Sequence, residues 1–233
     1  MIFEWTGKYT YLLLDVLTLV STLVLSFDKK VAFYKQWKYL FPGIFMGMLV
    51  FIPWDIAFTI HGIWGFNPSY LTGLYIWHLP IEEWLFFIAV PYATVFIYAC
   101  LEAYFGDPFF RFRNAIWWIW MLTAAGLFFL GFNAWYPRIT FGLLLLLLLL
   151  HRWFWGNRHM GKLGLMWLVH LIPFFSVNGV LTALPIVWYN DAENLGIRLG
   201  SVPLEDGFYS LLLLLIVFAS MWALKSVGNQ HHS

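Results

Sequence analysis

The sequence predicts an all-α integral membrane protein with seven transmembrane helices, arranged as two parallel three-helix repeats joined by a connector helix. Hydrophobic residues make up 62% of the 233 residues and charged residues only 11%, a composition that no soluble domain of this length needs. Long apolar runs alternate with short polar loops. The first half of the chain also recurs in the second half at a constant shift of 123 positions, as from Asn67 to Asn190. A recurring unit of this size indicates two copies of one helical substructure that together build one site.

Seven apolar runs reach the length of about 17–25 residues that a membrane-spanning helix needs. A β-barrel would require alternating apolar and polar residues, whereas residues 143–150 are leucine throughout. Helices are therefore expected over residues 9–27, 40–60, 81–104, 115–132, 139–155, 163–184 and 204–224. The first three form a repeat within residues 1–104, the fourth is a connector within residues 105–138, and the last three form a second repeat within residues 139–233.

The basic residues lie mainly at one end of these predicted helices. Lys8, Arg138 and Arg198 lie at the other end. The larger group comprises Lys29, Lys30, Lys35, Lys38, Arg111, Arg113, Arg152, Arg158, Lys162 and Lys225. The positive-inside rule then places the N-terminus outside and the C-terminus in the cytoplasm. We expect a multi-pass protein of the cytoplasmic membrane of a prokaryote.

Two acidic pairs begin matched helices. Glu82 and Glu83 follow Pro80, and Glu205 and Asp206 follow Pro203 at the same shift. Carboxylates at a helix start are common because the helix dipole favours negative charge there. Four of them at two equivalent starts, and at one depth near the outer face, indicate a functional site instead.

Further candidates surround these acids. Asp55 lies in an apolar run, where an acid costs about 2.5–3.5 kcal/mol on insertion scales and is usually placed in a cavity or paired. Asn178 occupies its matched position, and Asn67 matches Asn190. Aromatic residues directly after the acids are expected to line a pocket, namely Trp84, Phe86, Phe87, Phe208 and Tyr209. Asp15 and His170 have no counterpart, so we expect structural contacts to other helices. No histidine or cysteine stands at a metal-ligand spacing beside His170, and no metal site is expected.

Around these residues the sequence resembles the membrane-embedded carotenoid cyclases, in which two small homologous subunits, or their fusion, convert lycopene to β-carotene. The resemblance rests on residues 80–87 and 203–209, and on residues 64–68 with their shorter echo at 188–190. It implies a fused, two-repeat lycopene β-cyclase. The implied substrates are lycopene and γ-carotene, taken from the lipid bilayer, and other enzymes of carotenoid biosynthesis are implied partners. No nucleic acid partner and no cofactor are expected.

The resemblance also implies a chemistry. An acid protonates C2 of the linear ψ end group, the C5=C6 double bond attacks the cation at C1, and C6 loses a proton, so no electrons are transferred overall. A carboxylic acid held protonated in an apolar site is a suitable donor. We expect Glu82 and Glu205 to face the cavity, with Glu83 and Asp206 supporting them. Which carboxyl acts as acid and which as base stays open.

Three other classes of membrane protein are alternatives. A small-solute transporter with parallel three-helix repeats would share the topology, but its usual Pro-Gln signature is absent. A retinal-binding protein needs a lysine midway through the last helix, and Lys225 lies at its end. A membrane prenyltransferase needs Asp-rich diphosphate-binding motifs, for which residues 191–193 are too short. The transporter is the leading alternative.

Overall fold

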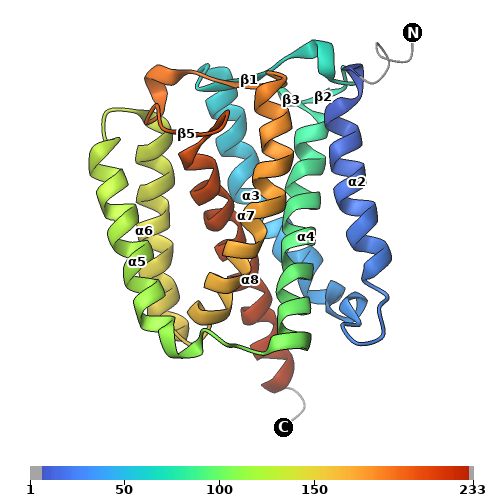
Figure 1. Cartoon of the computed structure of the whole chain (residues 1–233), viewed down its shortest axis with the longest axis vertical. Helices are drawn as coiled ribbons and strands as arrows, with labels where there is room; N and C mark the ends of the chain where they lie inside the picture. The colour runs from blue at the N-terminus through green and yellow to red at the C-terminus, as the bar shows by residue number, and fades with distance from the viewer. Residues whose placement is uncertain (1–6, 231–233) are drawn as a thin grey trace.

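The computed structural model describes residues 7–230, and the side chains of residues 7–226. Seven long helices form one bundle (Figure 1). They are α2 (Thr10–Leu25), α3 (Trp37–Ile60), α4 (Ile81–Phe105), α5 (Arg113–Leu130), α6 (Trp135–Trp155), α7 (Met160–Ala183) and α8 (Leu204–Gln230). Each coincides with one of the apolar runs, which confirms the predicted helices.

Five of these helices are long and apolar enough to cross a membrane. They are α4, α6, α7, α8 and the segment Phe33–Ile60, which joins a short 3-10 helix (η1, Phe33–Gln36) to α3. Helix α2 is apolar but has only 16 residues, and α5 is not among the five. That these two also span the bilayer stays a prediction.

The helices of the two halves pack in matched ways. Helix α3 packs mainly on α8 and α7 on α4, while α2 packs on α4 and α6 on α8. The connector α5 lies outside this arrangement against α6 and α7. Gly43 and Gly47 allow α3 to approach α8, because a Cβ at Gly43 would lie 2.9 Å from the Val217 carbonyl oxygen. Helix α8 is apolar on every side over residues 211–215 and is therefore buried in the centre.

One antiparallel ribbon crosses the ends of the helices (Figure 1). It pairs β1 (Trp64–Phe66) with β4 (Val187–Tyr189), and Gly65 lies opposite Trp188. These two residues are 123 positions apart, so each is the other's counterpart. The flanking pairs, Trp64 with Tyr189 and Phe66 with Val187, exchange places under the same shift. An antiparallel pair with this register has an approximate two-fold axis through its centre, as in a self-complementary dimer interface.

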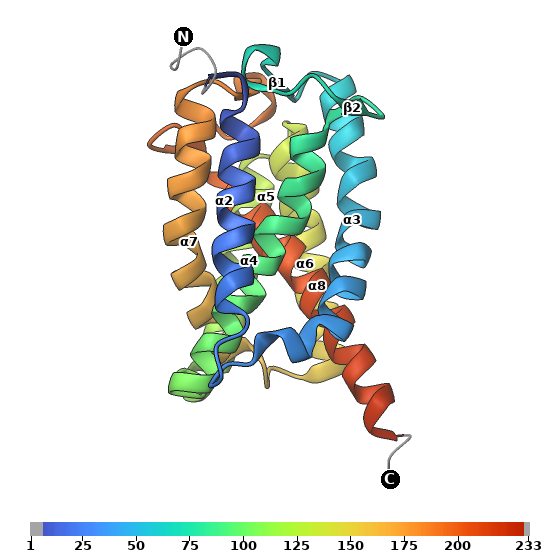
Figure 2. The same ribbon diagram turned by 90° about the vertical axis from the view of Figure 1, so that its right-hand side faces the viewer.

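Two hairpins, also related by the shift of 123 positions, lie beside the acidic helix starts. Strand β2 (Tyr75–Ile76) pairs with β3 (Leu79–Pro80), and β5 (Arg198–Leu199) pairs with β6 (Val202–Pro203). The Ile81 amide donates to the Leu74 carbonyl and the Leu204 amide to the Ile197 carbonyl, both at 2.9 Å. Each hairpin follows a 3-10 helix, η2 (Pro68–Tyr70) or η4 (Asp191–Glu193). Matched loops therefore hold the starts of α4 and α8 at the same end of the bundle (Figure 2).

Candidate active site

A narrow cavity lies beneath the ribbon, where the starts of α2, α4, α6 and α8 meet. Its cavity volume is about 40 Å³, within about 440 Å³ of free space that includes the open solvent at its mouth. Its walls are mainly aromatic, with two carboxyl groups and one amide: Tyr11, Trp64, Phe66, Glu83, Phe86, Tyr136, Phe174, Asn178, Leu181, Val187, Tyr189, Asp206 and Tyr209. Eight of these residues form four pairs at the shift of 123 positions, so the cavity lies on the approximate two-fold axis.

The carboxyls on the cavity are Glu83 and Asp206, the second acid of each pair. The expectation that Glu82 and Glu205 face it is wrong. Adjacent helical residues point about 100° apart, so only one acid of each pair can face inward. The loops determine which one, because they offer a backbone amide to the first acid of each pair.

Glu82 and Glu205 hold these loops. The backbone amide of Thr72 donates to Glu82 at 2.7 Å, and that of Leu195 donates to Glu205 at 2.6 Å. Both carboxyl groups are fully buried. Each contact spans the same ten positions of the chain and joins a helix start to the hairpin loop before it.

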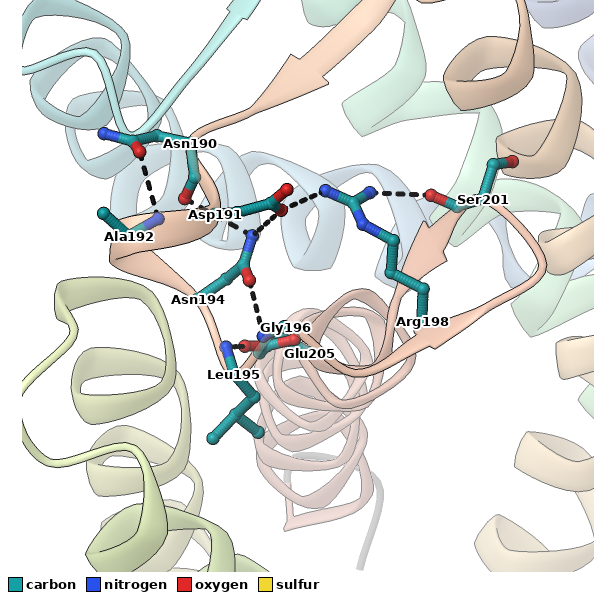
Figure 3. A network of polar contacts seen from close by, with 9 residues as sticks. All are labelled: Asn190, Asp191, Ala192, Asn194, Leu195, Gly196, Arg198, Ser201 and Glu205. Atoms are coloured by element: carbon teal, nitrogen blue, oxygen red, sulfur yellow. Dashed lines mark hydrogen bonds and ion pairs between the residues drawn. The ribbon is translucent and has the colours of Figure 1, made fainter.

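Figure 3 shows this loop in the second half. The Asn194 side chain accepts a hydrogen bond from the Gly196 amide at 2.7 Å. Arg198 pairs with Asp191 at 2.5 Å and donates to the Ser201 carbonyl at 2.8 Å. The hydrogen bond from Arg198, and secondly the one from Asn194, lower the pKa of the exposed Asp191 carboxyl. Polar contacts within the loop thus hold the Leu195 amide in the position from which it donates to Glu205.

Asn67 and Asn190 also belong to these loops and do not line the cavity. Their side chains accept hydrogen bonds from the backbone amides of Ser69 and Ala192, at 3.0 and 3.1 Å, at the starts of η2 and η4. An asparagine in this position caps a helical turn. Their matched positions therefore reflect loop structure and give no support to the expected substrate contact.

Asp206 accepts two phenolic hydrogen bonds. The Tyr136 hydroxyl donates to its Oδ1 atom and the Tyr189 hydroxyl to its Oδ2 atom, both at 2.7 Å. Burial, and secondly the charge of Asp206, hold the pKa of Tyr189 well above its ordinary value. Tyr189 is therefore a neutral donor. With a donor on each oxygen, Asp206 has the partners of a carboxylate.

Glu83 lies beside another carboxyl group. Its Oε2 atom accepts a 2.5 Å hydrogen bond from the Tyr11 hydroxyl. The carboxyl of Asp55, on α3, is close enough to interact with it directly. Asp55 accepts a 2.6 Å hydrogen bond from the Trp64 indole at Oδ1, while its buried Oδ2 has no donor among the described residues. Two adjacent buried carboxyls cannot both be ionised, so one proton held between them satisfies both.

The aromatic residues predicted to line a pocket divide into two groups. Phe86 and Tyr209 lie three residues after Glu83 and Asp206, on the same helix faces, and line the cavity. The other three point elsewhere: Trp84 donates to the Ile76 carbonyl, Phe87 lies in the core, and Phe208 packs on Phe141 and Trp167. Asn178 does line the cavity, and its amide donates to the Phe174 carbonyl.

Sequence reasoning missed the three tyrosines that bond to the acids. Tyr11 and Tyr136 lie near the starts of the first helix of each half, and Tyr189 lies in the ribbon. Tyrosine is common at membrane interfaces, so these residues gave no separate signal. Only their similar places in the two halves distinguish them.

His170 behaves as predicted, since it shares a 2.9 Å hydrogen bond with Thr94 on α4.

The fold and the cavity define a class: a helical membrane protein with buried carboxyl groups in an aromatic site on its approximate two-fold axis. The sequence model of the family described as lycopene cyclase matches residues 8–101 and 133–223, which is more than half of the chain. The chain therefore belongs to the lycopene cyclase family.

A bifunctional lycopene cyclase/phytoene synthase of Aspergillus oryzae is 28% identical over 75 residues. That match covers 32% of this chain and 13% of the relative, so the chain spans a small part of the relative's length. No solved structure matches the chain.

Proposed function

We propose that this protein is a lycopene β-cyclase, which converts ψ end groups to β-ionone rings by acid-initiated cyclisation without net redox change. One observation carries the proposal: Glu83 and Asp206 line the same aromatic cavity, and only Glu83 has a second carboxyl, that of Asp55, beside it. The pair can hold a proton, and the Asp206 carboxylate can accept one. Membership of the lycopene cyclase family supplies the substrate class. Lycopene would give γ-carotene and then β-carotene.

In the proposed architecture the chain crosses the membrane seven times, as two parallel three-helix repeats with α5 as connector. The shift of 123 residues relates the ribbon pairing, the two hairpins and the two carboxyl-to-amide contacts, which supports this arrangement. The positive-inside rule puts the cavity near the outer face.

The proton donor in this proposal is the pair of Asp55 and Glu83. The proton held between them adds to C2 of the end group, which leaves a cation at C1. The C5=C6 electrons then form the C1–C6 bond, and the positive charge moves to C5. Burial favours this donor, because the apolar surroundings disfavour the doubly charged form of the pair and so favour the form that holds a proton.

Asp206 is the proton acceptor. It takes the proton from C6, and the electrons of that C–H bond restore the C5=C6 double bond of the β ring. Tyr136 and Tyr189 hold the carboxylate in position before the reaction. The Tyr209 phenol lies near enough to Asp55, Glu83 and Asp206 to interact with all three. Between turnovers, exchange with solvent at the mouth of the cavity takes the proton from Asp206 and returns one to the donor pair.

Aromatic rings supply the remaining stabilisation. Tyr209 packs against Phe51 and Trp54 with ring centroids 4.8 and 4.9 Å apart, and Trp64 packs against Tyr136 at 5.0 Å. A cation over such a ring is stabilised by about 0.5–2 kcal/mol. The rings also exclude water, which would otherwise capture the cation.

The test is cyclisation of lycopene by the purified protein in liposomes made with deuterated water. The proposal expects β-rings that carry one solvent-derived deuterium each at C2, formed without added flavin or nicotinamide. Mass spectrometry of the separated pigments reads both the product and the label. Absence of rings, rings without deuterium at C2, or strict dependence on a reduced flavin would refute the proposal.

A further inference from the structure

The two sides of the cavity differ in size although they occupy matched positions. Around the axis, Glu83 matches Asp206 and Phe86 matches Tyr209, so the centre of the cavity is nearly symmetric. Away from the axis the side chains differ. On the α3 side the chain has Trp54, Phe58 and Trp64, and on the α7 side the matched positions 177, 181 and 187 hold valine, leucine and valine.

The large side chains close the α3 side. Phe58 packs against Trp64 with ring centroids 4.8 Å apart, and Trp64 packs against Tyr136 at 5.0 Å. Trp54 packs against Tyr209 at 4.9 Å. These contacts join α3, α6, α8 and the ribbon across that face. On the α7 side the smaller Leu181 and Val187 line the cavity directly, whereas Trp54 and Phe58 do not line it.

The α7 side continues as an apolar surface. Tyr11, Phe86, Phe174 and Leu181 belong to one apolar cluster that is separate from the main core. It lies where α2 and α7 both pack on α4 (Figure 2). Val90 packs on the same cluster one turn further along α4. The first four residues also line the cavity, so apolar side chains form a path from the acids along α2, α4 and α7.

We propose that the linear polyene enters from the bilayer between α2 and α7, with one end group in the cavity and the rest of the chain along this path. This inference rests on the proposed function. Because the α3 side is closed, only one end group reaches the acids in a binding event. The monocyclic product must therefore leave and bind again in the opposite orientation before the second ring forms.

The first experiment installs larger side chains on the α7 side. Leu181→Phe gives this position the residue that its counterpart, Phe58, already has, and it should reduce the initial rate of lycopene cyclisation by roughly 10- to 100-fold. Val180→Phe is the matched control, because Val180 is the neighbouring residue on α7 and is 37% exposed. It should leave the rate unchanged. Wild-type rates in Leu181→Phe would overturn the inference.

The second experiment needs no variant, so it decides the matter even if Leu181→Phe does not fold. Labelled lycopene is given to the wild-type protein in liposomes, followed within one turnover by an excess of unlabelled lycopene. Labelled γ-carotene should remain unbound and mix with the unlabelled pool. Labelled β-carotene formed at an undiminished rate would show that both rings form in one binding event and would overturn the inference. A wild-type protein that forms no ring at all would instead refute the proposed function.

Discussion

The two acids of each pair differ in what they contact, and conservative amide substitutions should separate their roles. Glu83→Gln keeps the shape of the side chain and can still accept from Tyr11, but an amide cannot hold or deliver the carboxylic proton. General acid–base groups typically contribute about 10²–10⁴-fold, which corresponds to roughly 2.7–5.4 kcal/mol of activation free energy. We expect a loss of that size for Glu83→Gln, and a similar loss for Asp206→Asn because an amide is a poor proton acceptor.

Glu82→Gln and Glu205→Gln are the matched controls. The amide oxygen of glutamine can still accept the hydrogen bond from Thr72 or Leu195, so only the charge assistance is lost. The difference between a charged and a neutral hydrogen bond is about 1 kcal/mol, which should lower thermal stability slightly and the cyclisation rate by no more than a few fold.

The assay is the initial rate of ring formation by each purified variant in liposomes, read by chromatography and divided by the amount of folded protein. The same four variants in cells that accumulate lycopene give an independent comparison. Activity in Glu83→Gln near that of the wild type, together with its loss in Glu82→Gln, would refute the assignment within the pair. It would also restore the arrangement that the sequence first suggested.

Three more predictions follow from particular contacts. Tyr136→Phe and Tyr189→Phe each remove one hydrogen-bond donor to Asp206, the proposed proton acceptor. Each should lower the cyclisation rate by roughly 10- to 100-fold, the equivalent of one charged hydrogen bond. An unchanged rate in both variants would exclude this role. Gly65→Val should lower the melting temperature measured in detergent, because a Cβ at residue 65 would lie 2.4 Å from the Trp188 ring, which it faces in the ribbon. Gly126→Ala is the neutral control, because no atom lies within 4 Å of a Cβ placed there. Lys30→Cys should react with a membrane-impermeant thiol reagent only from the cytoplasmic side, and labelling from outside intact cells would reverse the topology.

The helices were predictable because a helix that spans the hydrocarbon core of a bilayer needs about 20 consecutive apolar residues, and such runs are visible in the sequence. The starts of α4 and α8 fall at the predicted residues 81 and 204, because the proline before each ends a hairpin strand and proline is favoured at a helix start. Helix α6 instead begins at Trp135, earlier than the predicted residue 139. The polar Arg138 ended the apolar run there, but backbone hydrogen bonding does not stop where the hydrocarbon does.

The site was predictable in part. Buried acids in apolar runs are costly, which made Asp55 and the paired carboxyls visible in the sequence. The sequence did not show which acid of each pair faces the cavity. The positions of the acids along one helix do not determine which face of that helix the preceding loop covers. The Thr72 and Leu195 amides decide that, and they depend on hairpin geometry. The tyrosine donors were hidden for another reason, since their type is ordinary at a membrane interface.

In the proposed mechanism, the departures from symmetry lie where the reaction needs them. A cavity on the axis of two identical subunits would have identical walls, and identical walls cannot supply an acid on one side and a base on the other. Here Asp55 gives Glu83 a second carboxyl with which to hold a proton, while the matched Asn178 cannot carry one. Two neutral phenols hold Asp206 instead. Fusion of the two halves in one chain lets each half change separately, so the acid, the base and the single open side can each be assigned to one half.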